Sequence, residues 1–193
     1  GPCVVQALKD RGKRVFLDLK LHDIPNTMAG GVRVASQLGV DFLTLHTVGG
    51  AAMLEAARDA AGETRLLGVT VLTSLSAADL EVTWGRKSPS VVEEVGRLAD
   101  LAAQHRIHGV VVSPHEASSI RSRVGSEFLV VTPGIRPAGV GRDDQQRVAT
   151  PAAAIAAGAD YLVVGRSITR ASDPEAALYS ILTEIDLANS NDG

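Results

Sequence analysis

Six short runs of large aliphatic and aromatic residues recur along this chain, and alanine-rich segments with helical spacing lie between them. The runs are nearly continuous in Val, Ile, Leu and Phe rather than alternating with polar residues, which is typical of parallel strands covered on both faces. We therefore expect strands at residues 14–20, 41–47, 65–72, 109–113, 128–132 and 161–164.

The segments between these runs carry the signals of helices. Thr150 stands before Pro151 and Asp173 before Pro174, so each pair places a capping side chain ahead of a proline at the first helical position. Strand and helix therefore alternate along the chain. Apolar spacing predicts helices at residues 4–9, 29–38, 51–60, 91–105, 151–157 and 174–187.

This alternation implies right-handed crossovers and a parallel sheet, either open or closed into a barrel. Strands start about every 29 residues on average, close to the roughly 31 residues per unit of a typical eight-unit barrel. We expect one α/β domain spanning residues 1–193, a (β/α)8 TIM barrel of which about six βα units are present. Because the first helix-like segment has no strand before it, and six of eight strands would leave the core open, we also expect that N-terminal strands are missing from this sequence.

The composition argues against several classes of protein. The net charge is −3 with acidic and basic residues interspersed, so no charged run favours nucleic acid or a membrane surface. Cys3 is the single cysteine and the five histidines match no zinc spacing. No apolar stretch approaches the roughly 18 residues that cross a bilayer. We expect a cytoplasmic protein without a metal site that binds neither nucleic acid nor a membrane.

The segment at residues 18–27, DLKLHDIPNT, holds the most informative side chains. Asp18 and Lys20 are two residues apart in an expected strand, so both point to one side. They lie at its carboxyl end, where barrel enzymes keep their chemistry, and Asp23 follows in the loop. A single Asp-x-Lys is most simply a surface ion pair, so the tripeptide alone does not define a site.

The whole decapeptide resembles the signature of orotidine 5'-phosphate decarboxylases, and the resemblance extends over the rest of the chain. It implies decarboxylation of orotidine 5'-phosphate to UMP in de novo pyrimidine biosynthesis, with no metal or organic cofactor. It implies that Lys20 is the proton donor and that Asp18 and Asp23 form a charged network with it. Members of that family are homodimers, and the resemblance assigns Asp23 and Thr27 to the neighbouring subunit's site.

The chemistry of this reaction suits a fixed ammonium group. Loss of CO2 from C6 of the pyrimidine leaves a carbanion-like centre, whose charge develops only in the transition state. An ammonium held between Asp18 and Asp23 can stabilise that charge and deliver a proton to C6. Lys20 is therefore the expected catalytic residue.

Other residues are assigned to the substrate by the same resemblance. Thr73 and Ser74 follow the third expected strand, and the resemblance places them near the pyrimidine edge. Arg136 follows the fifth strand and opens a long loop rich in Gly, Asp and Gln, which suggests a lid. The resemblance assigns Arg136 and Gln145 to substrate binding, with Gln145 reaching the phosphate.

The last expected strand runs into Gly165 and Arg166. Barrel enzymes commonly bind phosphate after their last two strands, through backbone N–H groups and a helix N-terminus. Glycine lets the backbone approach the anion, and arginine can bind it through two parallel hydrogen bonds. We therefore expect Gly165 and Arg166 to bind the substrate's phosphate.

Two other functions fit parts of the sequence. Magnesium-dependent sugar-phosphate decarboxylases and aldolases of the 3-keto-gulonate-phosphate and hexulose-phosphate group share the Asp-x-Lys-x-x-Asp core. They typically continue with Ala-Gly, whereas this chain continues with Ile-Pro-Asn-Thr. A non-catalytic phosphate-binding barrel would also suit the missing strands. Chelation tests the first alternative, and substitution of Lys20 tests the second.

Overall fold

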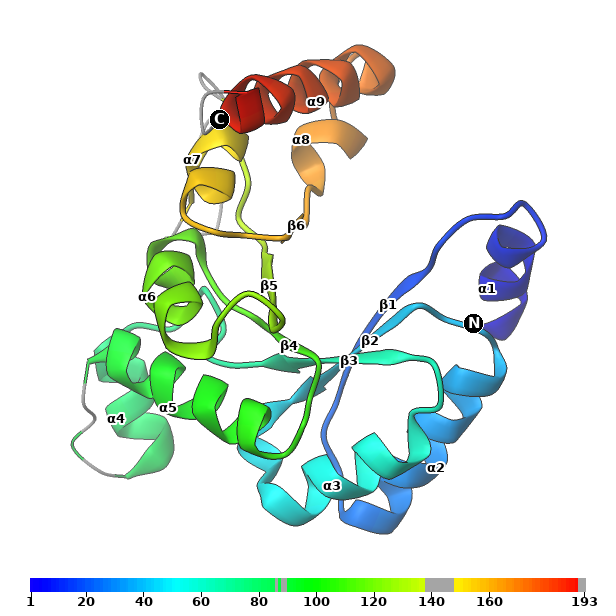
Figure 1. Ribbon diagram of the computed structural model, residues 1–193, viewed down its shortest axis with the longest axis vertical. Coiled ribbons are helices and arrows are strands. Elements are labelled where there is room, and N and C mark those ends of the chain that lie inside the picture. The colour runs from blue at the N-terminus through cyan, green and yellow to red at the C-terminus, as the bar shows by residue number, and fades with distance from the viewer. Residues whose placement is uncertain (86, 88–89, 138–147, 191–193) are drawn as a thin grey trace. The chain divides into compact units, whose positions relative to one another are not determined.

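The computed structural model describes residues 1–85, 87, 90–137 and 148–190, in which strands alternate with helices (Figure 1). The strand pairs β1–β2, β2–β3 and β5–β6 are parallel, and the strands are hydrogen-bonded in chain order. All six expected strands are present, which confirms the parallel α/β class. They are β1 (Phe16–Leu21), β2 (Phe42–His46), β3 (Arg65–Val69), β4 (Gly109–Val111), β5 (Leu129–Thr132) and β6 (Tyr161–Leu162).

The expected helices are all present, with ends that differ by a few residues. They are α1 (Pro2–Lys9), α2 (Pro25–Gln37), α3 (Ala51–Ala60), α5 (Val91–Gln104), α7 (Pro151–Ala156) and α9 (Pro174–Ser190). The two predicted caps are confirmed, because Thr150 accepts the N–H of Ala153 and Asp173 accepts that of Ala176. No helix in the described ranges is long and apolar enough to cross a membrane.

Three further helices and a 3-10 turn were not predicted. They are α4 (Ala77–Trp84), α6 (Pro114–Val124), α8 (Arg166–Thr169) and the turn η1 (Thr47–Gly49). Leu80 is the buried residue of α4, and Ile120 is the one large aliphatic residue that α6 buries. Such helices lack the apolar stripe on which prediction from sequence depends.

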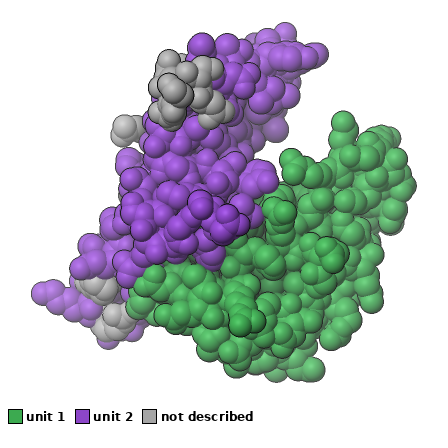
Figure 2. All heavy atoms as spheres, viewed as in Figure 1, with its two compact units in different colours: residues 1–70, 97–110 green, residues 71–96, 111–193 purple. Residues whose placement is uncertain are grey.

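Contacts divide the chain into two compact units (Figure 2). Unit 1 comprises Gly1–Thr70 and Arg97–Val110. In it β1, β2 and β3 form adjacent parallel pairs, and α2 packs against α3 (Figure 1). Its most buried large side chains include Leu43, Leu45 and Leu66, which are 0% exposed.

Unit 2 comprises Val71–Gly96 and Val111–Gly193. β5 pairs with β6, and α9 packs against both α7 and α8. Ile135, Ala154 and Ala159 form a buried cluster, against which Leu162 and Val164 pack. Leu162 of β6 and Val164, which precedes α8, therefore pack on the same small core.

Some strands begin with a side chain that accepts a hydrogen bond from the neighbouring strand, which we call a strand-start hydrogen bond. Asp41, directly before β2, accepts a hydrogen bond from the N–H of Val15 at 2.7 Å. It also forms an ion pair with Lys9 at 3.0 Å. The bond from Val15, with help from Lys9, holds the pKa of Asp41 below its usual value. Asp160, directly before β6, accepts the N–H of Val130 at 2.7 Å.

The same bond occurs before β4 with a histidine as the acceptor. Nδ1 of His108 accepts the N–H of Leu66 at 3.0 Å, and the N–H of His108 donates to the carbonyl of Leu66 at 3.1 Å. A ring nitrogen can accept only while it carries no proton. Burial, and secondarily the charge of Arg65, lower the pKa of His108, which favours this neutral acceptor.

Candidate active site

An ion pair at the carboxyl end of β1 joins two of the predicted catalytic residues. Nζ of Lys20 lies 2.5 Å from Oδ2 of Asp18. The side chains are 41% and 43% exposed respectively, so the pair lies at the surface of unit 1. A substrate can therefore reach the ammonium.

The pairing of β1 with β2 is irregular where this ion pair lies. Leu17 pairs with Leu43, and Leu21 pairs with Leu45. Between these two pairs, residues 18–20 of β1 lie opposite a single residue of β2, Thr44. Lys20 lies in this bulge with a left-handed backbone, φ 49°. Bulges bend a strand and redirect its side chains, and they are frequent next to active sites.

The hydroxyl of Thr44 connects the two strands inside the bulge. It accepts the backbone N–H of Lys20 at 2.9 Å and donates to Oδ1 of Asp18 at 2.8 Å. Thr44 is 1% exposed, so water does not compete for these bonds. The ion pair is thus fixed to β2 through one buried side chain.

Two histidines lie beside this ion pair. His22 follows β1 and His46 ends β2, with ring centroids 5.7 Å apart. Burial lowers the pKa of His46, and the nearby His22 and Lys20 act in the same direction, while Asp18 opposes them. His46 is therefore neutral at pH 7. In the described part of the chain, no group of three or more His, Cys, Asp or Glu residues is arranged to hold a metal ion.

Asp23 and Thr27 lie beyond the bulge, in the loop and at the start of α2. Oδ1 of Asp23 accepts the N–H of Ile24 at 2.7 Å. Among the described residues Asp23 forms no ion pair with Lys20. Asp23, Ile24 and Thr27 are all exposed, so the structure brings Asp18 and Lys20 together and leaves Asp23 and Thr27 at the surface.

Thr73 and Ser74 lie in an irregular segment of unit 2. The third expected strand was too long, because β3 ends at Val69. The segment turns through a hydrogen bond from the N–H of Leu75 to the carbonyl of Leu72. Thr73 is half-buried and Ser74 is exposed.

Arg136 lies next to the start of α8. Arg136 is buried, and its Nη1 donates to the carbonyl of Ile135 at 3.0 Å and to the hydroxyl of Ser167 at 3.3 Å. Ser167 directly follows Arg166, so Arg136 and the Gly-Arg pair are brought together within unit 2. Gln145 lies outside the described residues.

Gly165 and Arg166 are the residues at which α8 begins. Gly165 is the N-cap, and a Cβ atom at that position would meet nothing within 4 Å. Arg166 is half-buried as the first residue of the helix. Open space above a glycine backbone leaves room for an anion to approach.

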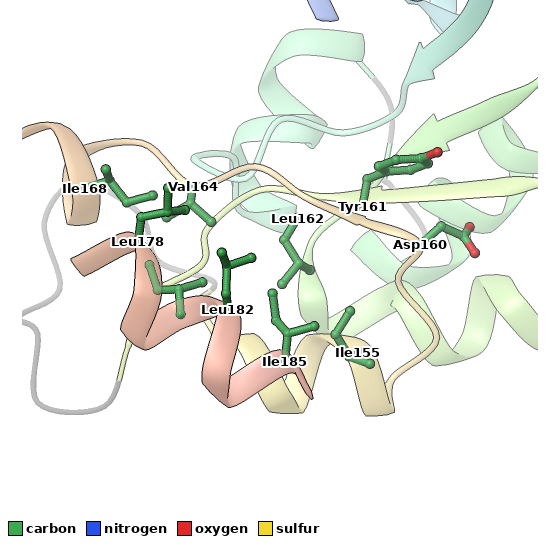
Figure 3. A pocket seen from close by; sticks show the side chains of 10 residues that line it. Ile155, Asp160, Tyr161, Leu162, Val164, Ile168, Leu178, Leu182 and Ile185 are labelled. Carbon is green, nitrogen blue, oxygen red and sulfur yellow. The ribbon is translucent and has the colours of Figure 1, made fainter. Parts of the chain in front are cut away.

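A pocket of about 370 Å³ lies in unit 2, and Val164 and Ile168, close to these residues in the chain, belong to its lining (Figure 3). Figure 3 shows aliphatic side chains of α9, α8 and β6 gathered around it, with Asp160 and Tyr161 set apart from them. Such a lining offers few donors to a phosphate. The pocket is therefore not the anion site expected after β6.

Two polar residues beside the predicted ones were missed from the sequence. Thr44 is the one hydroxyl in the run FLTLH and lies between apolar neighbours, and a polar residue inside a buried strand is a signal that could have identified it. Ser167 follows the Gly-Arg pair and bonds Arg136. Nothing in its local sequence distinguishes it from an ordinary helix-start serine.

Comparison with known proteins gives consistent results. The family model described as "Orotidine 5'-phosphate decarboxylase / HUMPS family" matches residues 1–181. The orotidine 5'-phosphate decarboxylase of Halorhodospira halophila is 54% identical over an alignment of 192 positions, which covers 97% of this chain and 80% of that protein. That of Moorella thermoacetica is 50% identical over an alignment of 196 positions, which covers 97% of this chain and 77% of that protein.

A solved structure agrees with these relatives. The crystal structure of orotidine 5'-phosphate decarboxylase from Lactobacillus acidophilus superposes with a TM-score of 0.84 at 40% identity, covering 96% of this chain and 81% of that one. The predicted TIM-barrel class is thereby confirmed, as is the resemblance noted in residues 18–27. This chain belongs to the orotidine 5'-phosphate decarboxylase / HUMPS family.

Proposed function

We propose that the protein is an enzyme that decarboxylates orotidine 5'-phosphate to UMP in pyrimidine biosynthesis, with Lys20 as the proton donor. The Asp18–Lys20 ion pair carries the proposal, because it holds an ammonium at the carboxyl end of a barrel strand. Relatives about half identical over nearly the whole chain are named for this reaction.

The proposed reaction needs only one proton from the protein. The bond between C6 and the carboxylate breaks, CO2 leaves, and the electron pair stays on C6. A proton passes from Nζ of Lys20 to C6, and the resulting neutral amine is reprotonated from solvent. The ammonium thus stabilises charge that appears only as the bond breaks.

Asp18 is proposed to hold the ammonium, and its second oxygen is occupied by the hydroxyl of Thr44. Asp23 and Thr27 are proposed to complete the site of the partner subunit in a homodimer. Their exposure at the loop before α2 supports this role. The residues proposed to bind the substrate are Thr73, Ser74, Arg136, Gln145, Gly165 and Arg166.

Both units are proposed to belong to one TIM-barrel domain, as the family match over residues 1–181 supports. The cytoplasmic location expected from the composition stays a prediction.

The test is to follow the loss of ultraviolet absorbance when orotidine 5'-phosphate is added to the purified protein. Lys20→Ala should lower kcat/KM by about 10²- to 10⁴-fold or more, since a positioned acid is lost together with its charge. Lys9→Ala is the matched control, because Lys9 forms a comparable ion pair with Asp41 away from the proposed site. A Lys20→Ala protein as active as the wild type would refute the assignment.

The family name also covers sugar-phosphate enzymes, and a chelator separates the two activities. EDTA should leave the decarboxylation unchanged, whereas a magnesium-dependent reaction would stop. If the protein binds orotidine 5'-phosphate without consuming it, the non-catalytic alternative stands.

A further inference from the structure

Thr44 occupies a special place in the pairing of β1 with β2. It is the residue that faces all of residues 18–20, so the bulge in β1 is built over its side chain. In a regular parallel pair the N–H of Lys20 would meet a main-chain carbonyl. Here it meets the hydroxyl of Thr44 at 2.9 Å.

The hydroxyl of Thr44 has one proton, which it donates in a hydrogen bond of 2.8 Å to Oδ1 of Asp18. The direction of both bonds is therefore fixed: Lys20 donates to Thr44, and Thr44 donates to Asp18. Asp18 in turn accepts from the ammonium of Lys20 at 2.5 Å. These contacts close a ring from the main chain of Lys20 back to its own side chain.

We propose that Thr44 is a positioning residue, whose hydroxyl joins Asp18 to the main chain of Lys20 and so fixes the direction in which the ammonium points. The inference rests on the proposed function. Thr44 is 1% exposed, so it does not touch the substrate and acts only through Asp18 and Lys20. Without the hydroxyl, Lys20 loses the partner of its main-chain N–H and Asp18 can rotate.

The expected effect is on the chemical step. A displacement of about 1 Å of a reacting group can cost on the order of 100-fold in rate, so Thr44→Val should lower kcat about 10- to 100-fold. KM for orotidine 5'-phosphate should change by no more than about twofold, because the proposed phosphate-binding residues are untouched. Thr44→Ser keeps the hydroxyl and should retain kcat within about threefold of the wild type.

Thr64→Val is the matched control. Thr64, directly before β3, is also a buried threonine of unit 1. Its hydroxyl donates to the carbonyl of Val40 at 2.9 Å. Its loss should lower the melting temperature and leave kcat unchanged. Thr44→Ala serves as a second variant if Thr44→Val does not fold, since it lacks the hydroxyl and adds no branch.

The outcomes separate this inference from the proposed function. If the wild type decarboxylates orotidine 5'-phosphate, Lys20→Ala does not, and Thr44→Val keeps the wild-type kcat, Thr44 has no positioning role and the function stands. If Thr44→Ser loses as much as Thr44→Val, the hydroxyl is not what matters, and the inference also fails. A wild type with no decarboxylation overturns both.

Discussion

Lys20 is one of two non-glycine residues in the described chain with a positive φ, the other being Arg106. A left-handed conformation costs a residue with a side chain about 1–2 kcal/mol. The ion pair of Lys20 with Asp18 is two-fifths exposed, and such pairs stabilise a fold by about 0–1 kcal/mol. The ion pair therefore does not offset the free energy that the left-handed backbone of Lys20 costs. Such an uncompensated conformation is typical of functional residues.

Gly68 in β3 is a position where one additional carbon would crowd the core of unit 1. A Cβ at this position would lie 2.5 Å from Oγ1 of Thr47, which is fully buried and has no hydrogen-bond partner among the described atoms. Gly68→Ala should therefore lower the free energy of unfolding by about 1–3 kcal/mol, measured by urea denaturation. Thr47→Ala removes the obstructing oxygen, so the double variant should recover most of the loss.

Gly30 provides the control for that experiment. It lies in α2 with nothing within 4 Å of a built Cβ. Gly30→Ala should stabilise the protein by up to about 1 kcal/mol through helix propensity. If Gly68→Ala and Gly30→Ala destabilised the protein equally, crowding at Thr47 would not be the cause.

At the scale of single residues, the sequence predicted part of the site. Alternation along a strand predicted that Asp18 and Lys20 share a side, and they are in contact. It could not predict the bulge, since the register depends on which residue of β2 lies opposite. For the same reason Thr44 was not identified, because its role exists only once the strands are paired.

At the scale of elements, the strand-start hydrogen bonds follow a common pattern. A left-handed residue and a buried apolar residue precede the accepting side chain before each of these strands. Gly39 precedes Asp41 and Gly158 precedes Asp160, while Arg106 precedes His108. A left-handed residue ends the helix, and the acceptor then ties the new strand to its neighbour.

The histidine acceptor makes one of these bonds sensitive to pH. The folded-state pKa of His108 lies below its usual 6.5, so the unfolded chain takes up this proton first as the pH falls. The stability contribution is complete above about pH 6.5 and is lost as the pH falls toward the folded-state pKa. His108→Asp should keep the bond and reduce this loss, measured as melting temperature from pH 8 to 5.

A smaller pH dependence should persist in His108→Asp, because the lowered pKa of His46 acts with the same sign. His115→Asp is the control, since His115 is an exposed residue of α6 outside the strand-start bonds. The explanation fails if His108→Asp and the wild type lose stability in parallel on acidification.

Element prediction worked where the sequence carries a compact apolar run or an apolar stripe, even in β1, which is largely exposed. All six strands were found because each is a compact apolar run, although β6 has only two residues and the third run was expected to continue past Val69. The helices α4, α6 and α8 were missed because they are short or bury few large side chains. The spacing of apolar residues is weak in such segments, so it does not detect them.

At the scale of the whole molecule, the proposed dimer predicts that two inactive proteins restore each other. If Asp23 serves the partner's site, a heterodimer of Lys20→Ala and Asp23→Ala subunits contains one intact site. Random mixing should then restore about a quarter of the wild-type sites. The measurement is the decarboxylation rate after the two variants are unfolded and refolded together.

Mixing Lys20→Ala with Asp18→Ala is the control, because both residues belong to the same subunit's ion pair. That mixture should stay inactive. Asp23 acts within its own subunit if the first mixture is equally inactive while each variant is dimeric by light scattering.

The strand-start hydrogen bonds and the ion pair of unit 1 lie at opposite ends of the strands. We therefore expect changes in heat tolerance and changes in the proposed chemistry to arise at different ends of these strands. A laboratory selection could strengthen the acceptors at the amino ends without touching the ammonium. Evolution toward a new substrate could likewise rework the carboxyl ends while the strands stay tied together.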